Sequence, residues 1–172
     1  QCIFGTPCTH WSCTSSSTTK LRHQRSGLCA ARRTLELLKL CRQMGVKWSI
    51  ENPASSRLWR WPALATFLRK SGAERILIHM CSYGARSKKP TVLFTNIPDL
   101  KSLGKLCVGS HVHERLQGTL CPNQGHQASK VVWKTSLASM YPPQLCRAWA
   151  AILASVAPPA SHRHGPGDFC GD

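Results

Sequence analysis

Short apolar segments that are typical of strands alternate along this chain with segments of helical periodicity, and this alternation most constrains its fold. The strand-like segments are VKWSI (46–50), RILIHM (75–80) and TVLFT (91–95), which are rich in β-branched or aromatic residues. Helical patterns cover residues 28–44 and 62–71. This order favours an α/β fold with a parallel sheet. The strands lack clean apolar–polar alternation, as expected when both faces of the sheet are covered.

The two helical segments carry start and stop signals of their own. Pro62 stands in the first turn of the second helix, and Gly45 and Gly72 follow the two helices as C-terminal caps. The expected core face of the first helix consists of Ala31, Leu35, Leu38 and Met44, widened by Leu37 and Cys41. The last two strands are joined too tightly for a parallel crossover, so we expect one antiparallel edge in the sheet.

The periodic pattern weakens after the third strand, which predicts the domain boundaries. We expect an α/β domain over 1–96, an irregular basic region with Cys and His over 97–140, a terminal helix over 141–156 and a disordered tail over 157–172. The Ser- and Thr-rich stretch over 13–27 is expected to be a mobile loop that can meet phosphate.

The charge of the chain predicts the class of its partner. Lys and Arg number 23 against 7 Asp and Glu, which gives a net charge of +16. Such an excess favours nucleic acid over an anionic membrane surface. The alternative is a basic fragment whose charge has no binding role. No apolar run approaches the roughly 20 residues of a membrane span, so no membrane partner is expected.

The cysteines predict the cellular compartment of the protein, and the first residue predicts that the chain is a fragment. Its ten cysteines are scattered, and several fall inside apolar patterns where a reduced thiol acts as a small hydrophobic group. We therefore expect reduced thiols and an intracellular protein, nuclear or cytoplasmic and not secreted, since no signal segment opens the sequence. Because the chain opens with Gln rather than Met, we expect it to be a fragment.

Three polar turns stand at the ends of predicted strands. They are TPC (6–8), ENP (51–53) and YGARSKKPT (83–91). In open α/β sheets, sites form at the carboxyl edge of the strands. We therefore expect Cys8 and Glu51 to converge at one edge of the sheet.

These three motifs resemble those of cytosine-5 DNA methyltransferases, in the family's order and at about its separations. GTPCTHWS is similar to the Pro-Cys nucleophile motif, IENP to the Glu-Asn-Val motif and YGARSKKPT to the later Gln-x-Arg-x-Arg segment. The variants ENPASSRLW and KKPT resemble divergent phage- or retroelement-associated members. The resemblance covers residues 3–96, with a weaker one at 141–153. It implies a partial Rossmann-like methyltransferase sheet, parallel with an antiparallel edge, a short irregular basic region and a C-terminal helix.

The resemblance also implies roles for individual residues. Cys8 is the nucleophile that adds to C6 of cytosine, Glu51 protonates N3 of the base, and Lys89 contacts the base carbonyl. Asn52 fixes the turn beside them. The implied substrate-binding residues are Pro7, Lys20, Arg22, Arg25, Arg86 and Lys88. A target base inside duplex DNA, the implied partner, would have to be flipped out.

The methyl donor implied by the resemblance is S-adenosylmethionine. In the family, the Gly-rich loop that binds this donor lies upstream of the Pro-Cys motif. Gly5 is the only glycine before that motif here, so the fragment alone is expected to be inactive. Ser87 stands where the family has Gln, and Lys89 replaces an Arg, which loses the bidentate fork. A second function stays open: a non-catalytic basic remnant that binds nucleic acid within a mobile-element protein.

The residues singled out above also have structural interpretations. Cys8 can be a buried thiol after a turn proline, and Glu51 a capping or solvated carboxylate. A cysteine hydrolase that pairs Cys8 with His10 is a third hypothesis, disfavoured because residues two apart on a turn rarely align for proton transfer. Core positions are expected for Trp48, Trp59, Trp61 and Trp149, while Trp11 can lie in the core or beside the site.

A separate Cys/His group lies in the basic region. The segment CVGSHVHERLQGTLC offers Cys107, His111, His113 and Cys121, which are zinc-ligand types. Their spacing matches no standard zinc finger, which favours the alternative of a pair of surface histidines near a buried cysteine. Both interpretations stay open.

Overall fold

A four-stranded mixed sheet forms the middle of the structure, a computed structural model that describes residues 1–6, 11, 20–120, 132–137 and 139–156. Its strands are β1 (Cys2–Gly5), β2 (Trp48–Pro53), β3 (Glu74–His79) and β4 (Pro90–Thr95), in the order β1-β2-β4-β3. A separate two-stranded sheet joins β5 (Thr119–Leu120) and β6 (Val132–Trp133). The fold is therefore α/β, as the alternating pattern predicts.

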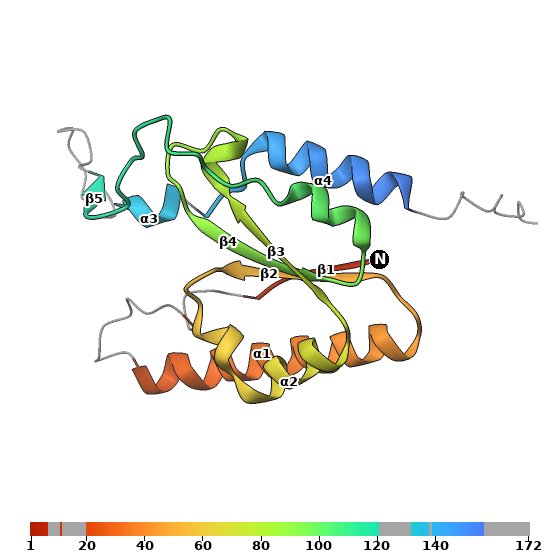
Figure 1. Cartoon of the computed structure of the whole chain (residues 1–172). Helices are drawn as coiled ribbons and strands as arrows, with labels where there is room; N and C mark the ends of the chain where they lie inside the picture. Colours follow the sequence, from red (N-terminus) through yellow and green to blue (C-terminus); the bar gives the residue numbers. More distant parts are fainter. Residues whose placement is uncertain (7–10, 12–19, 121–131, 138, 157–172) are drawn as a thin grey trace, which may run out of the picture.

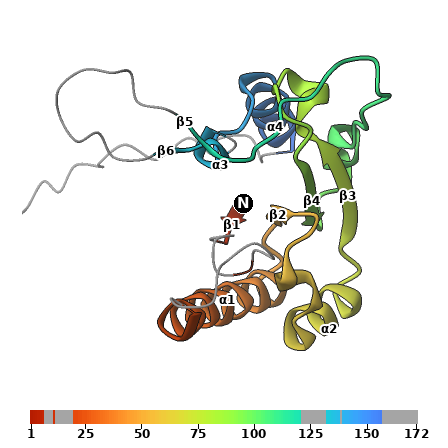
Figure 2. The same ribbon diagram turned by 90° about the vertical axis from the view of Figure 1, so that its left-hand side faces the viewer.

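Helices cover both faces of the four-stranded sheet (Figures 1 and 2). One layer holds α1 (Lys20–Gln43) and α2 (Pro62–Lys70), with the 3₁₀ helix η3 (Arg57–Arg60) beside them. The other holds α4 (Pro143–Ser155) and the 3₁₀ helices η4 (Met80–Tyr83) and η5 (Pro98–Leu103). The short helix α3 (Lys134–Leu137) follows β6. No helix within the described ranges is long and apolar enough to span a bilayer.

The strand directions refine the expected sheet. β1 pairs with β2 in parallel, and β4 pairs antiparallel with both β2 and β3. The antiparallel edge expected from the short connection between the last two strands is thus confirmed, with β3 as the edge strand. However, β4 alone runs against the other three strands, and it lies between β2 and β3 rather than at an edge. The reason is that pairing with β3 uses only one edge of β4. The other edge is free to pair with β2.

The first core lies between the sheet and the layer of α1 and α2. Leu38 of α1 and Trp48 and Ile50 of β2 are almost completely buried there, and the rings of Trp48 and Phe67 lie 5.7 Å apart. Most of the expected face of α1 is confirmed. The buried positions are Ala31, Leu35, Leu38 and Cys41.

Two positions of that expected face are wrong. Met44 is 68 % exposed and Leu37 is 48 % exposed. Met44 lies after the last residue of α1, where Gly45 at φ +65° turns the chain away from the helix axis. Leu37 lies next to the buried Leu38, at a position that points away from the sheet.

The second core lies on the opposite face and joins distant parts of the chain. Ile76 and Ile78 of β3 and Leu93 of β4 pack there with residues of η4, η5 and α4. The α4 residues are Leu145 and Trp149, both buried. The terminal helix therefore packs on the same sheet as the strands of the first 96 residues.

Several sequence boundaries shift in the structure. α1 begins at Lys20, so residues 20–27 are helical and not a loop, while residues 13–19 lie outside the described part of the chain. β2 continues through Pro53, so the ENP motif is the last part of a strand and not a turn after it. The expected disordered tail over 157–172 also lies outside the described residues.

The tryptophans occupy the expected core positions. Trp48 and Trp149 are buried, and Trp59 and Trp61 are partly buried against the first core. Trp11 also packs there, with its ring centroid 6.2 Å from that of Trp61. Trp11 therefore packs at the border of the first core.

Neighbouring leucines of α1 offer a matched test of this packing. Leu38→Ala is expected to lower the free energy of unfolding by about 2–5 kcal/mol, because it leaves a cavity at a fully buried position. Leu37→Ala changes a half-exposed side chain and is expected to cost less than about 1 kcal/mol. Urea denaturation followed by circular dichroism measures both. Equal losses for the two variants would contradict the assigned face of α1.

Candidate functional site

The parallel pair β1–β2 places the ends of two motif-bearing strands at one edge of the sheet. Gly5, the last residue of β1, pairs with Glu51 of β2. Beyond it, the carbonyl oxygen of Thr6 accepts a hydrogen bond of 2.7 Å from Nδ2 of Asn52. The chain that leads into Pro7 and Cys8 therefore leaves β1 directly beside Asn52. Pro7 and Cys8 themselves lie outside the described residues.

Asn52 is the residue that anchors this exit. Its side chain is 1 % exposed, and it faces the layer of α1, since its neighbour Glu51 faces the opposite one. The hydroxyl of Thr6 contacts that of Thr34 on α1 at 3.3 Å. Asn52 thus holds the end of β1 through a backbone bond. It does so from within β2 and not from a turn.

Glu51 is a buried carboxyl group with one known donor. It is 7 % exposed, and the hydroxyl of Tyr141, just before α4, donates a hydrogen bond to its Oε2. Its Oε1 has no hydrogen-bond partner among the described residues. Burial raises the pKa of Glu51 above its usual range, while Tyr141 and the nearby Lys89 act against that rise. A buried acceptor without a donor is costly, so this oxygen is a candidate ligand-binding atom.

Lys89 brings a positive charge close to this carboxyl group. It takes the left-handed conformation, with φ +28°, immediately before β4, and its Nζ lies 5.7 Å from the centroid of the Tyr141 ring. Arg86 and Lys88 of the same turn are exposed, while Ser87 is buried. Of the basic residues in this turn, Lys89 is the one whose charge acts on Glu51.

A pocket of about 340 Å³ opens beside this group. Its lining includes Met80, Arg86, Lys89, Glu114, Leu116 and Tyr141. Tyr141, which donates to Glu51, and Lys89, whose charge acts on Glu51, therefore also line this pocket. A planar polar ligand in the pocket would meet a cation, a phenol hydroxyl and an aromatic ring.

Three other expected substrate-binding residues lie on a helix. Lys20, Arg22 and Arg25 lie in the first turns of α1, in the helix and not in a loop. Because β1, α1 and β2 form a crossover, this end of α1 lies at the same edge of the sheet as the ends of β1 and β2 (Figure 1). The three residues therefore share an edge with Glu51.

Sequence reasoning missed Tyr141 and Thr6. Tyr141 precedes two prolines, and that pair was a usable signal, because prolines stiffen the chain that enters a helix. Nothing in the sequence pairs Tyr141 with Glu51, 90 residues away. Only the packing of α4 on the second face of the sheet brings them together.

The fold brings three of the expected Cys/His residues together with a fourth that the sequence did not single out. One ligand atom each from Cys81, Cys107, His111 and His113 lies within 4.8 Å of the others. Cys121, the fourth residue expected from the sequence, lies outside the described residues. Burial, together with Cys107, raises the pKa of the Cys81 thiol.

Comparison with known proteins does not identify a family for this chain. No family model, curated protein or solved structure matches the chain.

The hydrogen bond from Tyr141 provides a test of the buried carboxyl group. Tyr141→Phe is expected to raise the pKa of Glu51 further, because it removes a donor that favours the ionised form. An acid whose pKa is raised on folding stabilises the fold below its usual pKa of 4.5, and that contribution is lost as pH rises through the higher folded value. The loss should therefore occur at higher pH in the variant, with about 1 kcal/mol lower stability at neutral pH.

NMR titration of the side-chain carboxyl carbon of Glu51 measures this shift, with Glu51→Gln to assign the signal. The matched control is Tyr83→Phe, because Tyr83 donates to the carbonyl oxygen of Leu103 and not to Glu51. An unchanged Glu51 titration in Tyr141→Phe would refute the proposed coupling.

Proposed function

We propose that this chain carries the base-binding and nucleophile-bearing part of a cytosine-5 DNA methyltransferase-like protein. The observation that carries the proposal is the position of the buried carboxyl group of Glu51. It lies at the edge of the sheet where the chain leaves β1 toward Cys8, and the adjacent Asn52 holds that exit. The three motifs that resemble the family supply the choice of reaction.

The chemistry requires a nucleophile and an acid acting on the same ring. C5 of cytosine is a weak nucleophile, and addition of the Cys8 thiolate to C6 would convert the ring into an enamine that is reactive at C5. Negative charge would then build at N3, and protonation of N3 would neutralise it. A carboxyl group with a raised pKa retains a proton at higher pH than a solvated one, which suits Glu51 to donate it.

The surrounding residues would hold the base and its backbone. The phenol of Tyr141 and the charge of Lys89 border the pocket next to Glu51, and Lys89 would contact the base carbonyl. Arg86 and Lys88 are exposed in the same turn and would contact phosphate. Lys20, Arg22 and Arg25 at the start of α1 would add phosphate contacts at the same edge.

The described residues do not supply a site for a methyl donor. No Gly-rich loop follows a strand in the described ranges, and a Cβ built on Gly5 would meet nothing within 4 Å, so Gly5 does not form a tight cradle. S-adenosylmethionine therefore remains what the resemblance implies. The part of the reaction assigned to this chain's own residues is the reversible addition of Cys8 to the base.

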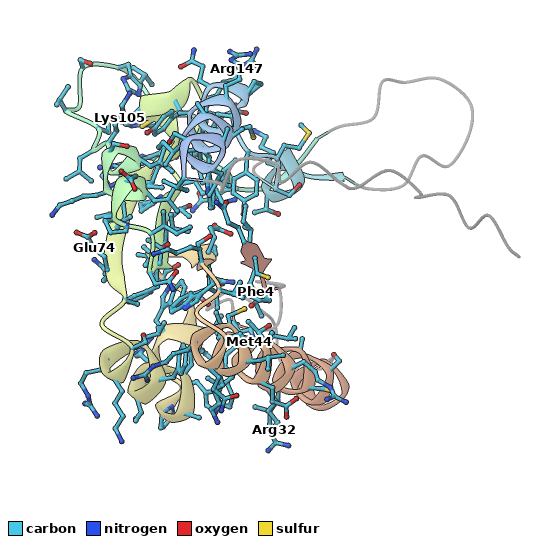
Figure 3. The ribbon with its side chains drawn as sticks, turned by 90° about the vertical axis from the view of Figure 1, so that its right-hand side faces the viewer. Phe4, Arg32, Met44, Glu74, Lys105 and Arg147 are labelled. Carbon is cyan, nitrogen blue, oxygen red and sulfur yellow. The ribbon has the colours of Figure 1, made fainter. Side chains whose placement is uncertain are left out.

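A non-catalytic nucleic-acid-binding protein is the second candidate, and one surface favours it. A groove of about 770 Å³ between α1 and α2 is lined by Lys39, Arg42 and Lys70. The basic surface is not a single stripe, however, because Arg32 on α1 and Arg147 on α4 project at opposite ends of the molecule (Figure 3). Such a distribution supports phosphate contacts without a defined path for a strand.

Exchange of the C5 hydrogen tests the addition step without a methyl donor. When the thiolate adds to C6, C5 takes up a solvent proton and then loses its original hydrogen as the thiolate leaves, so DNA with tritium at C5 of cytosine releases tritium to water. The protein is expected to release it, and Cys8→Ser to abolish the release. Glu51→Gln should slow it about 100-fold or more, since general acid catalysis contributes roughly that factor.

The matched control is Cys29→Ser, an exposed thiol on α1 that should leave the exchange rate unchanged. DNA binding at several salt concentrations is measured on the same proteins. Exchange that survives Cys8→Ser would refute the nucleophile. Salt-dependent binding with no exchange at all would establish the non-catalytic alternative instead.

A further inference from the structure

Four metal-ligating side chains meet at the corner where β3 leads into η4. Cys107 Sγ lies 3.3 Å from Nε2 of His113 and 4.0 Å from Nε2 of His111, and with Cys81 Sγ all four ligand atoms lie within 4.8 Å of one another. Tetrahedral zinc bound at about 2.0–2.3 Å separates such atoms by about 3.3–3.8 Å. The four atoms therefore need to move little to enclose a zinc ion.

The backbone around Cys107 forms hydrogen bonds that hold this cysteine in place. The N–H of Gly109 donates to Cys107 Sγ at 3.3 Å, and Gly109 takes a positive φ of +81° that favours glycine. The N–H of Cys107 donates to Nδ1 of His79 at 2.9 Å, which fixes the cysteine against the end of β3. Hydrogen bonds to a ligand sulfur and to its backbone orient a ligand and stabilise a thiolate.

The segment that carries three of these ligands lacks an apolar core. Residues 104–116 contain no helix or strand, and three of their apolar side chains, Leu106, Val108 and Val112, are 56 %, 90 % and 96 % exposed. Ordering such a segment costs roughly 1–2 kcal/mol per residue in backbone entropy. Cys107 and His113 are turned inward instead, toward the buried Cys81. A structural metal ion is one of the devices that stabilise a segment without an apolar core, because the free energy of metal binding contributes to folding.

We propose that Cys81, Cys107, His111 and His113 form a structural zinc site. Two sulfur and two nitrogen ligands in a tetrahedral arrangement suit Zn²⁺, and four protein ligands leave no open position for substrate. Binding releases the protons of the two thiols, so the ion is held by two thiolates and two neutral imidazoles. The site does not depend on the function proposed above.

The zinc site would also build one wall of the pocket beside Tyr141. Glu114, the residue after His113, lines that pocket, and its N–H donates to the carbonyl oxygen of Arg86 at 2.9 Å. Leu116 lines the same pocket. Zinc bound at Cys107 and His113 therefore holds this wall in place.

Metal analysis of the full chain tests the proposal. The protein purified with zinc is expected to contain one equivalent of zinc, and the protein reconstituted with cobalt(II) should show the d–d absorption of a tetrahedral site with thiolate charge transfer. Cys81→Ser and His111→Asn should each weaken zinc binding by more than the roughly 10- to 100-fold typical of changes around the ligands. His111 is exposed, so its variant leaves the packed core intact.

Two thiols that are not among the proposed ligands serve as controls. Cys121→Ser removes the fourth candidate ligand named from the sequence, and Cys146→Ser removes an exposed thiol of α4. Both are expected to bind zinc as the unchanged chain does. Absence of bound zinc and of a tetrahedral cobalt spectrum would overturn the proposal. Loss of zinc in Cys121→Ser with retention in Cys81→Ser would overturn the proposed ligand set.

Discussion

The pairing of β4 on both its sides is the constraint on which the rest of the structure depends. Thr91, Val92, Leu93 and Thr95 are almost completely buried, and the strand joins the β3 hairpin to the β1–β2 pair. Its side chains alternate between the two layers, so that Leu93 packs in the second core while the ring of Phe94 lies 5.2 Å from that of Trp59 in the first. One strand therefore connects both cores.

The register across β4 also decides what the candidate site residues face. Glu51 lies opposite Leu93 and therefore faces the layer of α4, where Tyr141 donates to it. Asn52 lies opposite Val92 and faces the layer of α1, where it donates to the carbonyl oxygen of Thr6. A shift of one residue would exchange these faces and separate each side chain from its partner. The carboxyl group and the anchor of the β1 exit are thus consequences of one register.

Glycine positions and connection lengths predicted those features that depend on nearby residues alone. Gly45 and Gly72 have positive φ and follow α1 and α2 as expected, and the hairpin of β3 and β4 followed from the short connection. The prediction failed where strand pairing extends an element through polar residues. Polar Glu51 and Asn52 continue β2 because β4 pairs with both of them and β1 also pairs with Glu51. The start of α1 was missed because its first residues are polar and carry no apolar period.

The sequence by itself determined the α/β class, the C-terminal ends of α1 and α2, most of the buried face of α1 and the chemical types of the candidate residues, because these depend on side-chain periodicity and on glycine and proline. Only the tertiary structure decided that β4 lies inside the sheet, that Tyr141 reaches Glu51 and that Cys81 joins Cys107, His111 and His113. Those contacts join residues far apart in the chain. Their formation depends on which strand edges and helix faces remain to be paired, and no local pattern encodes that choice.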